Sequence, residues 1–222
     1  MGVIISLVSQ KGGSGKTTIA VNLAGALREH ISEVLLIDAD KQHSALTWRA
    51  AAGENGFPVQ VIGMPQPVLH QEAPKHAEKY PLVMIDSPSG YHDSTIPRSA
   101  ILAASLVIIP VQPTAVDMWA ARDTVKLVEE VQLMNPTLKA MLVVSRAITH
   151  TKLSEQAREA LEALNLPVFR TQISQRVVLA EAPLHGKLIL DYQSQARDEF
   201  RALALEVMEV IHHGKEIIEE RA

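Results

Sequence analysis

A glycine-rich stretch near the N-terminus, Lys11-Gly12-Gly13-Ser14-Gly15-Lys16-Thr17-Thr18, constrains the fold more than any other feature of the chain. It follows the continuously apolar run Val3–Val8, which is typical of a buried strand, and it opens the helical pattern Thr17–Arg28. Glycines let the backbone turn so that successive N–H groups point inward, and the start of the next helix attracts anions. A Gly-Lys-Thr ending in this context predicts a phosphate-binding loop, with Lys16 on the outer phosphates and the Thr17 hydroxyl on Mg²⁺.

The alternation of apolar runs and helical patterns continues along the chain. Further continuously hydrophobic runs, which suit strands buried on both faces of a parallel sheet, occupy Val34–Ile37, Val59–Ile62, Leu82–Ile85, Leu106–Ile109 and Ala140–Val144. Helical patterns cover Ala115–Met134, Leu153–Leu164 and about Ser194–His213. This order predicts an α/β protein: a three-layer P-loop fold with a mostly parallel twisted sheet and helices on both faces.

No linker or repeat divides the chain, so we expect residues 1–222 to form a single domain. The proline-containing segment Met64–Pro81 interrupts the rhythm, and we expect a short irregular helix there over the sheet edge. The last helix should end near His213, and the polar tail Gly214–Ala222 should fray.

Composition excludes several classes of protein. The chain has no cysteine, which removes disulfides, thiolate zinc sites, iron–sulfur ligation and a cysteine nucleophile, and which fits the cytoplasm. Its formal net charge is −4, so any contact with DNA must come from a local basic patch.

A second lysine, Lys11, immediately precedes the glycine pair, although spacing alone does not exclude an ordinary surface lysine. The pattern Lys-Gly-Gly-x-Gly-Lys-Thr-Thr resembles the deviant Walker A motif of the ParA/MinD family of ATPases. Further segments that resemble the family's motifs are Leu35–Gln42 (switch I), Val83–Pro88 (Walker B and switch II), Ile108–Pro113 and Ala180–Lys187. The short length and Thr47-Trp48 after switch I are most similar to the small plasmid-partition type called ParF.

The resemblance implies a dimer in which Lys11 of each subunit contacts the ATP of the other. Asp40 lies just past a strand end, where a carboxylate can orient or deprotonate the attacking water. Asp86 ends an apolar strand, where a charge is costly unless it faces a ligand or Mg²⁺. We therefore expect Thr17, Asp40 and Asp86 at the metal. Asp38 has alternative roles at the loop, in the metal shell or as a strand cap, and Lys41, where the family usually has proline, leaves the switch I conformation open.

The base is expected to be adenine. A guanine site normally presents an aspartate after Thr-Lys-x, whereas Thr151-Lys152-Leu153 is followed by Ser154. Arg146, after the sixth predicted strand, has a guanidinium plane that suits stacking on adenine. The hydrogen bond to the base would then fall to backbone near Pro113.

The resemblance implies a weak ATPase that forms a homodimer with ATP, binds DNA without sequence preference and releases it when a cargo-bound adaptor of the ParB or ParG type stimulates hydrolysis. Partition of plasmid or chromosomal DNA on the nucleoid is the default expectation. A protein microcompartment or a chemosensory cluster is an alternative cargo, and a metabolic ligase or kinase is a competing class. A MinD-like membrane protein is not expected, because Lys215–Ala222 is acidic. Candidate DNA contacts are Lys152, Arg170, Arg176, Lys187, Arg197 and Arg201.

Overall fold

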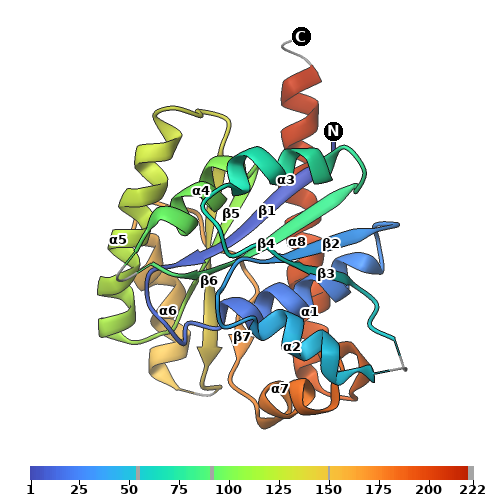
Figure 1. Ribbon diagram of the computed structural model, residues 1–222. Coiled ribbons are helices and arrows are strands. Elements are labelled where there is room, and N and C mark those ends of the chain that lie inside the picture. The colour runs from blue at the N-terminus through green and yellow to red at the C-terminus, as the bar shows by residue number, and fades with distance from the viewer. Residues whose placement is uncertain (54–55, 91–92, 150, 220–222) are drawn as a thin grey trace.

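The computed structural model describes residues 1–53, 56–90, 93–149 and 151–219, with side chains described as far as residue 212. Seven strands form one sheet in the order β3-β2-β4-β1-β5-β6-β7, and every neighbouring pair is parallel (Figure 1). The strands are β1 Val3–Ser9, β2 Val34–Asp38, β3 Gln60–Gly63, β4 Leu82–Ser89, β5 Leu106–Val111, β6 Lys139–Ala147 and β7 Ile173–Ser174. The predicted parallel α/β fold is confirmed.

Helices cover both faces of this sheet. They are α1 Lys16–Arg28, α2 Ser44–Ala51, α3 Leu69–Ala77, α4 Thr95–Ala103, α5 Ala115–Gln132, α6 Lys152–Glu162, α7 Val177–Glu181 and α8 Gln195–Glu219, with short 3₁₀ turns at Ala182–His185 (η2) and Ile189–Asp191 (η3). Within the described part of the chain, none of these helices has the length and apolar content needed to cross a bilayer.

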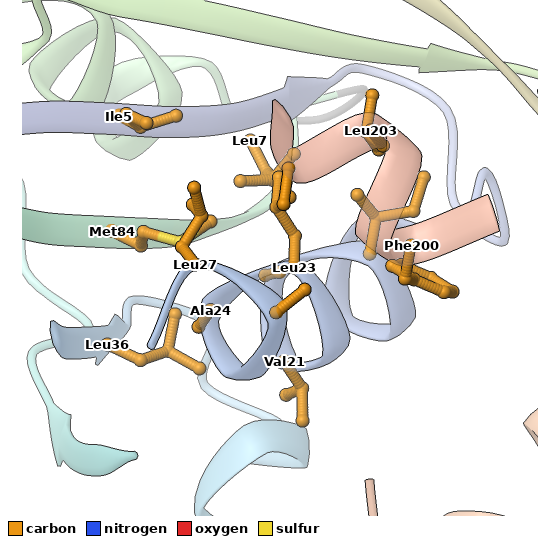
Figure 2. Packing of buried hydrophobic residues seen from close by; sticks show 14 of the residues in the cluster. Ile5, Leu7, Val21, Leu23, Ala24, Leu27, Leu36, Met84, Phe200 and Leu203 are labelled. Carbon is orange, nitrogen blue, oxygen red and sulfur yellow. The ribbon is translucent and has the colours of Figure 1, made fainter. Parts of the chain in front are cut away.

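Alternation along the strands divides the core into two layers. Ile5 and Leu7 of β1 face α1 and α8, where they pack with Leu23 and Phe200 (Figure 2). The neighbouring residue Ile4 points to the opposite face, into the cluster beneath α3 and α4. Both faces of β1 are therefore buried, which explains why its sequence is continuously hydrophobic.

Two sequence-based expectations about helices differ from the structure. The short helix expected within Met64–Pro81 does form, as α3, but it packs against α4, β1 and β4 rather than over the sheet edge, because Leu69, Ala73 and Ala77 present a small apolar face to the sheet. The last helix, α8, does not end near His213 but continues to Glu219. The remainder of the predicted frayed tail, residues 220–222, lies outside the described residues.

The topology brings together the carboxyl ends of the central strands. Strand β1 lies between β4 and β5, and Asp38 at the end of β2 is in register with Asp86 of β4. In open parallel sheets, ligands bind at this edge. The glycine-rich loop between β1 and α1 lies there, so the fold places the predicted site residues at one end of the sheet.

Candidate functional site

The glycine-rich loop adopts a left-handed backbone conformation, which favours glycine, at two positions. Gly13 has φ +76° and Gly15 has φ +91°, both in the left-handed region. A Cβ atom on Gly15 would also lie 2.7 Å from the Ser145 hydroxyl oxygen. Gly15 is the N-cap of α1 and offers no side-chain acceptor, so the first N–H groups of the helix are left for an anion.

A cleft of about 340 Å³ opens at this loop. It is lined by Gly12–Ile19, by Asp40 and Ser89, by Ser145 and Arg146, and by Ile173–Arg176, Leu179 and Ala180. The volume lies in the range of small-ligand sites. Every predicted loop residue from Gly12 to Thr18 lines the cleft, whereas Lys11, Asp86 and Pro113 do not.

The two lysines of the loop have different surroundings. Lys16 is 7% exposed and donates a hydrogen bond from Nζ to the Lys11 carbonyl oxygen at 3.3 Å. Burial lowers the pKa of Lys16, while Asp86 and Asp40 oppose that shift. Lys11 instead forms an ion pair with Asp117 at the start of α5, with 2.7 Å between Nζ and Oδ1. Lys16 can therefore meet a phosphate in its own cleft, and Lys11 is held outside it.

The three aspartates at the strand ends have separate places. Asp38 is fully buried and accepts hydrogen bonds from the backbone N–H of Asp40 at 3.1 Å and of Leu46 at 3.0 Å. It therefore holds the switch I loop to α2, which is a structural role. Asp40 lines the cleft and accepts a bond from the N–H of Gln42 at 2.9 Å. The turn from Asp40 to Gln42 thus forms with Lys41 at the position where the switch I motif usually has proline.

Asp86 is the most perturbed of the three. It is 1% exposed, and neither of its carboxylate oxygens accepts a well-formed hydrogen bond from any described residue. Burial raises the pKa of Asp86 to about 7; the nearby Thr17 hydroxyl and Lys16 oppose the shift, and Asp38 and Asp40 add to it. No group of three acidic or histidine side chains that could hold a metal occurs in the described part of the chain. An orphaned carboxylate beside a threonine hydroxyl nevertheless suits Mg²⁺ that takes its remaining ligands from phosphates and water.

Replacing Asp86 by asparagine should stabilise the nucleotide-free protein at alkaline pH. The folded pKa of about 7 is above the ordinary value of 3.8, so ionisation of Asp86 opposes folding increasingly as the pH rises between these values. At pH 8 the gain in unfolding free energy should be about 4 kcal/mol, and it should shrink as the pH falls toward 4.

Urea denaturation from pH 5 to pH 8 measures this effect. Asp93→Asn is the control, because hydrogen bonds from Thr95 hold the pKa of the exposed Asp93 below its ordinary value. It should gain no stability in that range. An Asp86→Asn curve parallel to the wild-type curve would contradict the assignment of an unfavourable buried charge.

The part of the cleft lining that lies outside the loop differs in part from expectation. Arg146 lines the cleft, but its Nη1 donates to the Gly13 carbonyl oxygen at 3.0 Å, as does Nε2 of Gln112 at 2.9 Å. Sequence reasoning missed Ile173–Arg176, because β7 has only two residues and shows no periodicity. The late segment resembling the family motif, Ala180–Lys187, pointed only to the far margin of this wall.

The candidate DNA contacts do not form a free basic patch. Four of them are in ion pairs: Arg170 with Glu206 and Glu209, Arg176 with Glu199, Arg197 with Asp198, and Arg201 with Glu29. Lys152 and Lys187 have no ion-pair partner among the side chains that the structure describes.

Comparison with known proteins agrees with this geometry. The family model described as the CobQ/CobB/MinD/ParA nucleotide binding domain matches residues 5–189. The chain is 28% identical over 212 residues to the maintenance of carboxysome distribution protein A of Halothiobacillus neapolitanus, with 92% of this chain and 95% of the relative covered. It is 32% identical over 238 residues to the chromosome-partitioning ATPase Soj of Thermus thermophilus, with 92% and 94% covered.

Among solved structures, the septum site-determining protein MinD of Pyrococcus horikoshii, complexed with Mg-ADP, has the same fold. Its TM-score is 0.74 at 23% identity, with 96% of this chain and 99% of that chain covered. The family match spans most of the chain, including the loop, the aspartates and β7. The chain therefore belongs to the ParA/MinD family of nucleotide-binding domains.

Proposed function

We propose that this protein is a ParA-type ATPase that forms a sandwich dimer with ATP, binds DNA without sequence preference and positions a large cargo on it. The observation that carries the proposal is the place of Lys11. Its side chain is 37% exposed, lies outside the cleft of its own chain and is held by Asp117. A second copy that presents its nucleotide to this surface can recruit Lys11 when the ion pair opens.

The proposed nucleotide is ATP with Mg²⁺. The loop N–H groups and Lys16 would bind its phosphates, and Thr17, Asp86 and Asp40 are the groups available to the metal, which when bound neutralises phosphate charge. Asp40 would accept the proton of the attacking water. The relative solved with Mg-ADP supports this nucleotide form.

The cargo is proposed as a class. Relatives matching nearly the whole chain are named for carboxysome distribution and for chromosome partitioning, which supports positioning of a large object. Partition of plasmid or chromosomal DNA with a ParB- or ParG-type adaptor is the first candidate, and a protein microcompartment is the second. Because all four candidate arginines are ion-paired, DNA binding would depend on cations such as Lys152 and Lys187 being aligned by the dimer.

The test is DNA binding with ATP, with ADP and without nucleotide, across salt concentrations. We expect binding only with ATP, weakening as salt rises because phosphate contacts release counterions. Lys11→Ala should bind nucleotide as a monomer like the wild type, yet lose ATP-dependent dimerisation in sedimentation experiments and DNA binding with it.

Two outcomes would contradict the proposal. A Lys11→Ala variant with full dimerisation, turnover and DNA binding would remove the role of Lys11 across the interface. ATP turnover that needs a small-molecule acceptor and ignores DNA would indicate a metabolic enzyme of related fold.

A further inference from the structure

Two carboxylates of α8 hold the chain just before the short strand β7 and at the last residue of that strand. Glu206 accepts hydrogen bonds from the N–H of Arg170 at 2.7 Å and from the N–H and hydroxyl of Thr171 at 2.8 and 2.6 Å. Two turns earlier, Glu199 accepts from the N–H and hydroxyl of Ser174 at 2.9 and 2.7 Å. Each carboxylate side chain is 12% exposed, so these are well-shielded, charge-assisted bonds.

Only one of these clamps reaches the cleft. Ser174 lines it, and so does Arg176, whose Nη2 lies 3.4 Å from an oxygen of Glu199. The residues held by Glu206 do not line it. Glu199 itself does not line the cleft, so it acts on the wall from behind.

The wall held by Glu199 is available to the nucleoside part of a ligand. With the phosphates at the loop, beside Lys16 and Asp40, the rest of the lining is left for base and ribose, and it includes Ile173–Arg176. This wall is anchored in the core at Ile173, whereas its later residue Gln175 is exposed. Among the described strands, the two-residue strand β7 pairs with β6 alone, and the helix that follows, α7, buries none of its residues.

We propose that Glu199 is a positioning residue for the nucleoside wall: by fixing Ser174 and Arg176 it sets the affinity for base and ribose without contacting the nucleotide. Because the wall is already ordered before the ligand binds, binding does not include the entropic cost of ordering the wall. This inference rests on nucleotide binding in the cleft, one part of the proposed function, and is independent of dimerisation, DNA and cargo.

Calorimetric titration of Glu199→Gln with ATP and with inorganic tripolyphosphate tests the inference. The glutamine amide has one acceptor oxygen where the carboxylate has two, so it cannot accept from the N–H and hydroxyl of Ser174 and from Arg176 together, and the negative charge that strengthens these bonds is lost. Affinity for ATP should fall about tenfold, the effect of losing one charge-assisted hydrogen bond. Affinity for tripolyphosphate, which touches only the loop, should change less than about twofold by the same reasoning.

Glu206→Gln is the matched control, because it removes the same kind of clamp from the same helix at the same exposure but does not reach the cleft. It should keep the wild-type ratio of ATP to tripolyphosphate affinity. If Glu199→Gln folds poorly, Glu199→Asp keeps the charge, shortens the reach and should shift the ratio in the same direction.

An equal loss of both ligands in Glu199→Gln, or an equal change of the ratio in both glutamine variants, would overturn the inference in favour of general loosening. A wild-type protein that binds tripolyphosphate but not ATP would overturn it as well. If the wild type bound neither ligand, the nucleotide site of the proposed function would fail first.

Discussion

Lys16→Ala is expected to abolish ATP binding. Three cationic side chains line the cleft, and two of them are already engaged: Arg146 with the Gly13 carbonyl and Arg176 with Glu199. The Lys16 ammonium has only the Lys11 carbonyl as its hydrogen-bond partner among the described residues. Backbone N–H groups alone cannot balance a triphosphate, so losing this buried charge should weaken affinity at least about 100-fold, equivalent to roughly 3 kcal/mol.

Calorimetry at a protein concentration where the chain is monomeric measures this loss. Lys11→Ala is the control, since it removes a lysine of the same loop whose side chain lies outside the cleft, and it should bind ATP within about twofold of the wild type. Thermal melts of both variants are needed, because Lys16 also faces the buried Asp86. A folded Lys16→Ala protein with wild-type affinity would disprove the assignment of the phosphate site.

Features with strong local signatures could be predicted from the sequence. Six strands were predicted from continuous hydrophobic runs. Such a run reflects burial on both faces in β1, where six of seven residues are buried, but not in the edge strand β3, where Val61 alone of the four residues is buried. The loop was predicted because its glycines allow a local backbone conformation that can be recognised from the sequence alone, as Gly13 and Gly15 show with their positive φ angles. Asp40 and Asp86 followed from charges at the ends of apolar strands, which are costly without a ligand.

Contacts between distant segments could not be predicted. The pairing of Lys11 with Asp117 and the clamp of Glu199 on Ser174 each join positions far apart in the chain. Nothing in the spacing around these acidic residues distinguishes them from solvated surface charges. The prediction of where α3 packs was wrong for the same reason. Leu69, Ala73 and Ala77 indicate that the helix has a buried face, but not which strands cover that face. Asp38 could be assigned only when its two backbone donors were seen.

The switch I loop has the structure that a water-activating carboxylate requires. The buried carboxylate of Asp38 fixes the backbone at Asp40 and at Leu46, so the loop is anchored at both ends of the turn. Asp40 is itself the first of these two anchored residues, and it lines the cleft. Lys41 stands where the family usually has proline, but this substitution does not disturb the switch I loop. The Asp40 carboxylate accepts a hydrogen bond from the N–H of Gln42, and this bond forms the turn that proline would otherwise favour.

Asp40→Ala is therefore expected to separate dimerisation from hydrolysis. The variant keeps the loop, Lys16 and Lys11, so it should form ATP-dependent dimers in sedimentation experiments. Single-turnover release of phosphate should slow by about 10²- to 10⁴-fold, the usual contribution of a general base. Asp123→Ala, which removes an exposed carboxylate of α5 that pairs with Lys126, is the charge control and should hydrolyse ATP at the wild-type rate. An Asp40→Ala protein that stays monomeric with ATP would show that Asp40 builds the dimer interface instead of activating water. Dimers that form and remain on DNA would show that hydrolysis is the step that releases the protein from DNA.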